Sequence, residues 1–166
     1  EQCIASWHMH MPEWELKAWT EENFDISAAP QYVQEAYAAK KYAFVSDYVR
    51  LWALEREGGV YLDTDVEVLR SFDALLVDTA FIGLEESLAL LPGTCVMACE
   101  PHCKWVKDML ALYDGIEFVK PDGSLDLTTN VQRMGVVMMK ELRSERMNEL
   151  TNEGLSELGK YWKQVQ

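Results

Sequence analysis

The sequence predicts an α/β fold in which helices flank a mostly parallel sheet. Three observations support this class. Apolar residues recur at helical spacing in some segments, they alternate at strand spacing in others, and the two kinds of segment follow each other along most of the chain. With 166 residues, of which 49% are hydrophobic and 26% charged, the chain has the material for one globular domain, residues 1–166.

The N-terminal part predicts two helices joined by a long connection. Apolar residues at helical spacing predict a helix that ends before Pro12. A short apolar-rich run at residues 14–19 is compatible with a strand, and residues 20–30 hold the polar and turn residues of a connection. A second helix is predicted from Gln31, where apolar residues make one face.

The middle of the chain predicts a helix followed by an extended segment. Apolar residues repeat at three and four over residues 45–53, as in a helix that lies on a core. Gly58 and Gly59 are placed to end that helix with a left-handed cap. Beyond them, apolar and polar residues alternate over residues 60–68, which is the two-residue repeat of a strand or extended chain.

The later elements are predicted from short local signals. Residues 80–84 and 94–98 are rich in residues that suit a buried sheet. Pro101 is predicted to open a helix with an apolar inward face, and the turn signal at residues 121–123 predicts a small hairpin. From Thr129 the chain is expected to be mostly helical, so residues 128–166 are predicted as a helical segment without an assigned role.

The charge of the chain excludes several classes of partner. The sequence has 15 basic and 28 acidic residues, which gives a net charge of -13 at pH 7. Such a charge repels nucleic-acid phosphates and anionic lipid head groups, so no nucleic-acid partner is expected. An anionic ligand would need a cation beside it. No Gly-rich phosphate loop is present, which argues against kinases and dehydrogenases.

Location is predicted from the absence of targeting signals. No apolar run reaches the ~20 residues of a transmembrane helix, and residues 1–7 lack the layout of a secretion signal, so no transmembrane segment is expected. The four cysteines are too few and too unevenly spread for a disulfide scaffold. These observations favour the cytoplasm, including a peripheral position at the inner face of the membrane.

Two aspartates separated by one residue form the strongest candidate site. Asp63 and Asp65 would lie on the same side of an extended chain, about 7 Å apart. Their oxygen ligands select Mg²⁺ or Mn²⁺, and an ion held by two protein carboxylates keeps positions open for water and the diphosphate of a nucleotide. The alternative is an ordinary polar face on a half-exposed strand.

A second pair of charged residues lies on the helix just before these aspartates. Asp47 and Arg50 are three residues apart, so they lie on neighbouring helix faces, where one accepts and the other donates hydrogen bonds. The hydroxyls of a sugar ring suit both. The alternative is a surface ion pair worth about 0.3 kcal/mol.

These two segments together resemble a known family. Residues 43–50 read Ala-Phe-Val-Ser-Asp-Tyr-Val-Arg and residues 58–66 read Gly-Gly-Val-Tyr-Leu-Asp-Thr-Asp-Val. They resemble the sugar-binding region of the DXD glycosyltransferases, family 32, which groups yeast-type initiating mannosyltransferases with bacterial capsule and lipopolysaccharide glycosyltransferases. Residues 3–7, 19–24 and 81–85 are similar to the bacterial branch, so the resemblance covers about residues 1–127.

The resemblance implies a fold, a reaction and a set of ligands. The fold would be GT-A, with a Rossmann-like sheet. The reaction would be hexosyl transfer with retention of configuration, from a UDP- or GDP-sugar to a saccharide or lipid-linked acceptor in polysaccharide biosynthesis. The cofactor would be Mn²⁺ or Mg²⁺, and a cation of this kind stabilises the diphosphate charge that develops as the sugar leaves.

The resemblance also implies roles for individual residues. Asp65 would bind the metal, and Asp63 would hold ribose or sugar hydroxyls and share in the metal site. Asp47 and Arg50 would hold the donor sugar. Glu85, at the predicted end of a strand, would lie near the reacting carbon; the alternative for Glu85 is a solvated acid in a loop.

Two departures from the family pattern leave alternatives open. Members usually begin with a strand and loop at the nucleobase pocket and end with a segment bearing His or Ser and Trp, and neither segment is found before Glu1 or after Thr128. The domain is therefore expected to be incomplete at both ends. One alternative function is a truncated or degenerate module that binds metal or nucleotide sugar without transfer. Another is a structural α/β domain with no ligand.

Overall fold

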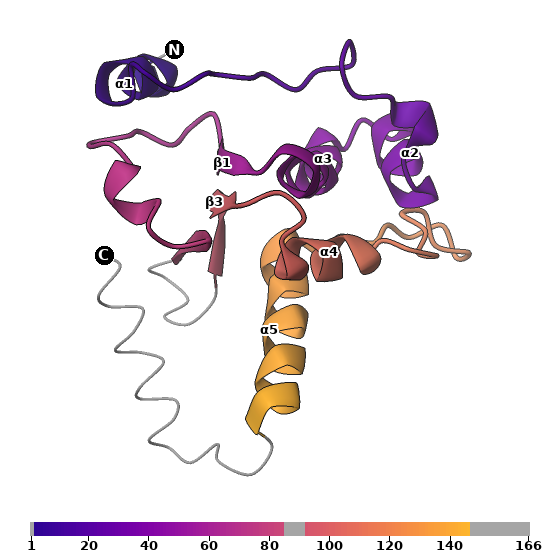
Figure 1. The fold of residues 1–166 in the computed structure, drawn as a ribbon. Helices are drawn as coiled ribbons and strands as arrows, with labels where there is room; N and C mark the ends of the chain where they lie inside the picture. Colours follow the sequence, from indigo (N-terminus) through magenta and orange to yellow (C-terminus); the bar gives the residue numbers. More distant parts are fainter. Residues whose placement is uncertain (1, 85–91, 147–166) are drawn as a thin grey trace.

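Helices predominate in this protein, and a small sheet lies among them (Figure 1). The structure is a computed structural model that describes residues 2–84 and 92–146. In chain order, its elements are α1 (Gln2–His10), the 3-10 turn η1 (Ile26–Ala28), α2 (Gln31–Ala38), α3 (Tyr42–Glu57), β1 (Gly59–Leu62), the 3-10 turn η2 (Asp73–Leu75), β2 (Ala80–Leu84), β3 (Pro92–Cys99), α4 (Lys104–Ala111) and α5 (Asn130–Arg146).

The sheet has three strands in the order β1-β3-β2, and both pairings are antiparallel. The prediction of an α/β fold is confirmed, but the prediction of a mostly parallel, Rossmann-like sheet is wrong for the described residues. The connection from β2 to β3, residues 85–91, is shorter than the dozen or more residues that a parallel crossover needs, so these neighbours must run in opposite directions. Strand patterns had located the strands but carried no information on their direction.

One face of the sheet packs on the main core. Tyr61 of β1, Met97 of β3 and Ile82 of β2 lie side by side in the register, and Met97 is fully buried. Figure 1 places α2, α3, α4 and α5 on the same side of β1 and β3. The buried residues shared by these elements include Tyr32, Val33, Leu51, Leu54, Val106, Met109, Tyr113 and Phe118.

A second, smaller cluster lies under α1 at the other side of the sheet in Figure 1. Its buried members are Trp7, Met11 and Val68, with Leu62 and Phe72 packed against them. The predicted helix before Pro12 is confirmed as α1. Because Val68 belongs to this cluster, the alternating pattern of residues 60–68 indicated real burial, although only its first part forms a strand.

The end of α3 requires a glycine. Gly58 has a φ of 66°, and its N–H donates to the carbonyl of Leu54 at 2.9 Å. A Cβ at this position would lie 2.7 Å from the carbonyl oxygen of Cys99 and 2.7 Å from Cδ of Pro101. No other residue fits that approach without displacement, so the prediction that a glycine ends this helix is confirmed, although its ψ of -152° differs from that of the left-handed cap expected.

Several other predicted boundaries differ from the structure. Residues 14–19 form no strand, and the alternating segment leaves the sheet after Leu62. The helix expected at Pro101 begins at Lys104, because His102 has a positive φ of 64° that interrupts helical geometry. The helix predicted from Gln31 and the hairpin are confirmed, the latter as a bridge between Val119 and Leu125.

The helical prediction for the C-terminal part is confirmed from Asn130 to Arg146, and its remainder lies outside the described residues. Over residues 2–84 and 92–146, no helix combines the length and the apolar character that a membrane crossing needs.

Candidate functional site

The two aspartates of the predicted metal site lie where the chain leaves β1. The N–H of Asp63 donates to the carbonyl of Cys95 at 2.9 Å, which is the last bond to β3. The N–H of Val66 then donates to the carbonyl of Asp63 at 3.0 Å and closes a turn. Asp65 therefore lies in a turn, and the extended geometry predicted for residues 63–65 is wrong.

Side chains of α1 hold the chain just after this turn. The indole N–H of Trp7 donates to the carbonyl of Val66 at 2.8 Å. The hydroxyl of Ser6 accepts from the N–H of Val68 at 2.8 Å. The carbonyl of Val66 and the N–H of Val68 are thus paired with side chains of α1. The sequence pattern had suggested pairing with a neighbouring strand instead.

Arg50 is the centre of a buried charged cluster. Its side chain is only 7% exposed and forms ion pairs with Asp63 at 3.1 Å and with Asp47 at 3.3 Å. The guanidinium also donates to the carbonyl of Thr94 at 2.8 Å, and to the carbonyl and hydroxyl of Ser46 at 3.2 and 3.0 Å. These contacts join α3 to the ends of β1 and β3.

The Asp47 and Arg50 pair is therefore not the solvent-exposed ion pair that the sequence left open. Its two side chains are 14% and 7% exposed. A buried guanidinium needs all its donors directed at acceptors, and all three nitrogens of Arg50 have partners. Removal of such a buried partner typically costs about 3 to 5 kcal/mol of stability.

Tyr61 completes the contacts of Asp63. Its hydroxyl donates to Oδ1 of Asp63 at 2.6 Å, and its ring lies 4.6 Å from the guanidinium carbon of Arg50. Burial raises the pKa of the Tyr61 phenol, and the bond to Asp63 raises this pKa further, although Arg50 acts against both. The phenol thus stays a neutral donor at physiological pH.

Three carboxylate oxygens of Asp63 and Asp65 have no partner among the described residues. Arg50 and Tyr61 both contact Oδ1 of Asp63, whose side chain is 31% exposed, while Oδ2 forms no hydrogen bond or ion pair within the described part of the chain. Asp65 is exposed, and its side chain forms no hydrogen bond or ion pair with the other residues that the structure describes. One oxygen of Asp63 and both oxygens of Asp65 are therefore available to a hard cation.

Asp63 and Asp65 fit a divalent cation only if other groups supply the rest of its ligands. No group of three or more His, Cys, Asp or Glu side chains that could hold a metal occurs among residues 2–84 and 92–146. Carboxylate oxygens are what Mg²⁺ and Mn²⁺ prefer, and ions of this kind commonly take their other ligands from phosphate and water.

Asp47 is held from the far side by the start of α5. Its Oδ2 accepts from the backbone N–H of Asn130 at 3.1 Å, and its backbone carbonyl accepts from Nδ2 of Asn130 at 2.6 Å. Burial raises the pKa of Asp47, while Arg50 and the bond from Asn130 oppose that rise. The carboxyl is therefore costly to bury and depends on these two partners.

The structure brings together four of the five predicted site residues. Asp47, Arg50 and Asp63 share contacts, and Asp65 lies in the adjoining turn. Glu85 lies outside the described residues.

Sequence reasoning missed several contributors to the site. They are Tyr61, Ser46, the carbonyl of Thr94 and Asn130. Tyr61 and Ser46 stand within the motif segments and were available as candidates. Asn130 lies 83 positions after Asp47, and no local pattern links the two.

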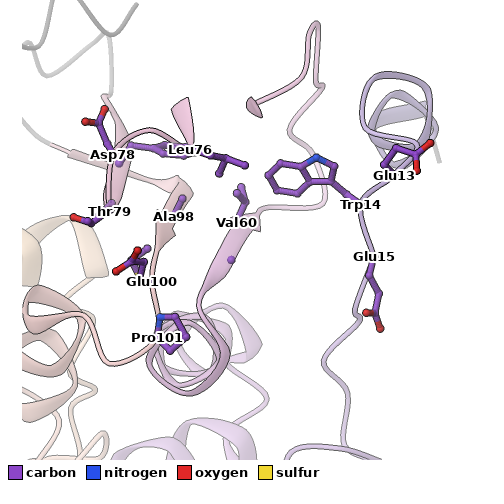
Figure 2. A pocket seen from close by; sticks show the side chains of 14 residues that line it. Glu13, Trp14, Glu15, Val60, Leu76, Asp78, Thr79, Ala98, Glu100 and Pro101 are labelled. Carbon is purple, nitrogen blue, oxygen red and sulfur yellow. The ribbon is translucent and has the colours of Figure 1, made fainter. Parts of the chain in front are cut away.

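A cavity of about 520 Å³ lies apart from this cluster. Figure 2 shows the indole of Trp14 turned toward Val60 and Leu76 across it. Val60 pairs with Ala98 in the register and so points away from the face that holds Tyr61 and Arg50. The charged residues that line the cavity are all acidic, namely Glu13, Glu15, Asp78 and Glu100, so it is unsuited to a diphosphate.

Comparison with known proteins agrees with the site. A family model described as "Glycosyltransferase sugar-binding region containing DXD motif" matches residues 1–82, a range that includes Asp47, Arg50, Asp63 and Asp65. A relative named "Glucan organizing enzyme 1", from Cryptococcus neoformans var. grubii serotype A, is 35% identical over 83 residues. That match covers 45% of this chain and 23% of the relative, so the chain corresponds to less than a quarter of that protein.

The matched relative is fungal, whereas the sequence resemblance pointed to the bacterial branch, which stays a prediction. No solved structure gives a significant match. The resemblance to DXD glycosyltransferases is nevertheless confirmed, since residues 1–82 match the DXD-containing sugar-binding region of glycosyltransferases.

Proposed function

We propose that this protein is a metal-dependent, retaining hexosyltransferase that moves a sugar from a UDP- or GDP-sugar to a saccharide or lipid-linked acceptor. The observation that supports this most is the cluster in which buried Arg50 contacts both Asp47 and Asp63 beside the exposed Asp65. It lies within the segment that matches the sugar-binding region.

In this proposal Asp65 and the uncommitted oxygen of Asp63 hold Mn²⁺ or Mg²⁺. The bound ion would neutralise the diphosphate and stabilise the charge that develops on it as the sugar departs. The need for such an ion follows from electrostatics, because a chain with a net charge of -13 otherwise repels its donor.

The donor sugar is proposed to lie on the side of Asp47, Arg50 and Asp63. Because Arg50 is committed to protein acceptors, its main task is to fix the two carboxylates so that they accept hydrogen bonds from sugar hydroxyls in one orientation. Asp63 is the most exposed of the three and is the best placed for direct contact. Glu85 is retained as a proposed group near the reacting carbon.

The proposal is tested by donor hydrolysis. The protein is incubated with UDP-glucose, UDP-galactose and GDP-mannose, with and without Mn²⁺, and both binding of the donor and release of the free sugar are measured. Slow hydrolysis of one donor that requires the ion is expected. Metal-dependent binding without hydrolysis would favour the alternative of a non-catalytic binding module, and no binding of any donor would contradict both readings.

A further inference from the structure

We propose that Asn130, the first residue of α5, is a positioning residue for the donor site. It acts through Asp47 and Arg50 and touches neither substrate nor metal. This inference rests on the proposed function of the cluster around Arg50. It assigns to the C-terminal part of the described chain, beyond residues 1–82, a task in the sugar-binding region.

The side chain of Asn130 is fixed in one orientation by its surroundings. It is 1% exposed. Its Oδ1 accepts from the hydroxyl of Tyr113 at 2.7 Å, and its Nδ2 donates to the carbonyl of Asp47 at 2.6 Å. A carbonyl accepts only, so the nitrogen of the amide must face Asp47, and the amide cannot be flipped without loss of this bond.

Asn130 holds Asp47 by two separate groups. The amide nitrogen of its side chain binds the backbone carbonyl of Asp47, and its backbone N–H binds the carboxylate at 3.1 Å. The carboxylate therefore has a fixed place relative to the axis of α3. This matters because Asp47 shares Arg50 with Asp63, at 3.3 and 3.1 Å.

The position of a guanidinium between two carboxylates depends on which of the two carboxylates other groups hold in place. With Asp47 fixed by Asn130, Arg50 keeps its position over Tyr61, and Oδ1 of Asp63 keeps both of its donors. Without the Asn130 side chain, the backbone carbonyl of Asp47 loses its donor, and the backbone N–H of residue 130 is no longer held in place against the Asp47 carboxylate, which then relies more on Arg50. The disturbance then reaches Asp63 through contacts that are all present in the structure.

The start of α5 does not need this side chain for its own capping. Thr129 and Gln132 form a reciprocal capping box: the N–H of Thr129 donates to the Gln132 side chain at 3.1 Å, and the N–H of Gln132 donates to the Thr129 hydroxyl at 3.4 Å. The Asn130 side chain is directed instead at α3 and at Tyr113, the residue that follows α4 and its cap. A matched control is thereby available at the same helix end.

The test compares Asn130→Ala with Gln132→Ala in the full 166-residue chain. Both variants weaken the start of α5, so both are expected to lower the melting temperature. Only Asn130→Ala is expected to shift the Nε–H signal of Arg50 in arginine-labelled NMR spectra, assigned by loss of that signal in Arg50→Lys. Only Asn130→Ala is expected to weaken binding of the donor with Mn²⁺, by about tenfold.

An unshifted Arg50 signal in Asn130→Ala would overturn the inference, as would a shift of equal size in Gln132→Ala. The NMR measurement needs no donor, so it stands even if no nucleotide sugar binds the wild type, which would contradict the proposed function alone. If Asn130→Ala does not fold, Tyr113→Phe serves instead, because it removes only the hydroxyl that holds Oδ1 of Asn130. The same signal should then shift by a smaller amount, and an unchanged signal would overturn the inference.

Discussion

Two buried arginines have similar surroundings and differ in the charge that faces them. Arg50 and Arg133 are 7% and 8% exposed in their side chains; Arg50 lies against one tyrosine ring and Arg133 against two. Arg133 has one carboxylate partner, Asp126, at 2.9 Å. Arg50 has two, Asp47 and Asp63. The charges of Arg133 and Asp126 therefore balance, whereas Arg50, Asp47 and Asp63 together keep an excess of negative charge.

The aspartates of the two groups respond differently to their environment. Burial opposes ionisation of Asp126, but bonds from the N–H and hydroxyl of Thr128 and from Arg133 outweigh it and lower the pKa of Asp126. Burial prevails at Asp47 and raises its pKa despite Arg50. The comparison teaches that Arg133 and Asp126 tie a loop to α5 with balanced charge, although the buried Nε of Arg133 has no hydrogen-bond partner among the described residues. The Arg50 group is left with unbalanced charge that a bound cation would relieve.

Removal of each arginine should separate the two groups most strongly. Arg50→Met leaves two neighbouring carboxylates without their cation, so we expect a loss of about 3 to 5 kcal/mol in the free energy of unfolding. Arg133→Met leaves Asp126 with its bonds from Thr128, so we expect about 2 kcal/mol. Urea denaturation at pH 7 measures both values. Equal losses would mean that the excess charge around Arg50 has no energetic weight.

Loss of the exposed aspartate should abolish the response to metal without weakening the fold. Asp65→Ala is expected to remain within about 0.5 kcal/mol of the wild type in the absence of metal, because the side chain is exposed. Mn²⁺ at a hundredfold excess over its dissociation constant should stabilise the wild type by about 2.7 kcal/mol and the variant by much less.

Glu67→Ala is the control for this experiment, since Glu67 is an exposed acid two residues further along. Thermal unfolding with and without Mn²⁺ is the measurement. Equal stabilisation of wild type and Asp65→Ala would remove Asp65 from the site, and loss of the response in Glu67→Ala would indicate a diffuse effect of surface charge.

The tyrosine next to each arginine provides a smaller test. Tyr61 donates to the carboxylate of Asp63 at 2.6 Å, and Tyr32 donates to the backbone carbonyl of Asp126 at 3.1 Å. Each Tyr→Phe change should cost about 1 kcal/mol of stability through the lost hydrogen bond. Only Tyr61→Phe should also reduce stabilisation by Mn²⁺ in a thermal scan, because Asp63 loses a donor that orients it. A reduction of the same size in Tyr32→Phe would show that the two groups are not distinct.

The smallest expected effect is the opposite pH dependence of the two aspartates. The folded pKa of Asp126 is lowered, so its contribution to stability is present above its unfolded value of about 3.9 and is lost as the pH falls through the folded value. The folded pKa of Asp47 is raised, so its contribution is present below about 3.9 and is lost as the pH rises through the folded value.

Unfolding free energies of Asp126→Asn and Asp47→Asn, each compared with the wild type from about pH 2 to about pH 7, measure these contributions. The advantage of wild type over Asp126→Asn should shrink toward low pH, and its advantage over Asp47→Asn should shrink toward high pH. Trends of the same sign would contradict the opposite shifts.

Local patterns predicted most of the elements. The helices α1, α2 and α3 were located because helical spacing of apolar residues is a property of one segment, and the glycine at the end of α3 was predicted because helices commonly end at glycine. The positions of β2 and β3 also followed from local composition. Strand direction did not, because pairing joins segments that are distant in the sequence.

In the candidate site, too, local patterns predicted some features and missed others. Asp47, Arg50, Asp63 and Asp65 were singled out by spacing within two short segments. The turn at Asp65 was missed because Val66 and Val68 alternate as in a strand, although Val68 is buried under α1 rather than in the sheet. Asn130 was missed because its bond to Asp47 spans 83 positions, which no periodicity can reveal.

The anchoring of the chain on both sides of Asp65 has a further consequence. On one side the backbone of Asp63 is bound to β3, and on the other the indole of Trp7 and the hydroxyl of Ser6 bind residues 66 and 68. The few residues between these anchors have little conformational freedom left, so an ion that settles there would immobilise almost nothing new. The affinity for this ion would therefore depend on enthalpy and hydration. Loosening of α1 would lower the affinity through an added entropy cost, although no coordinating atom would change.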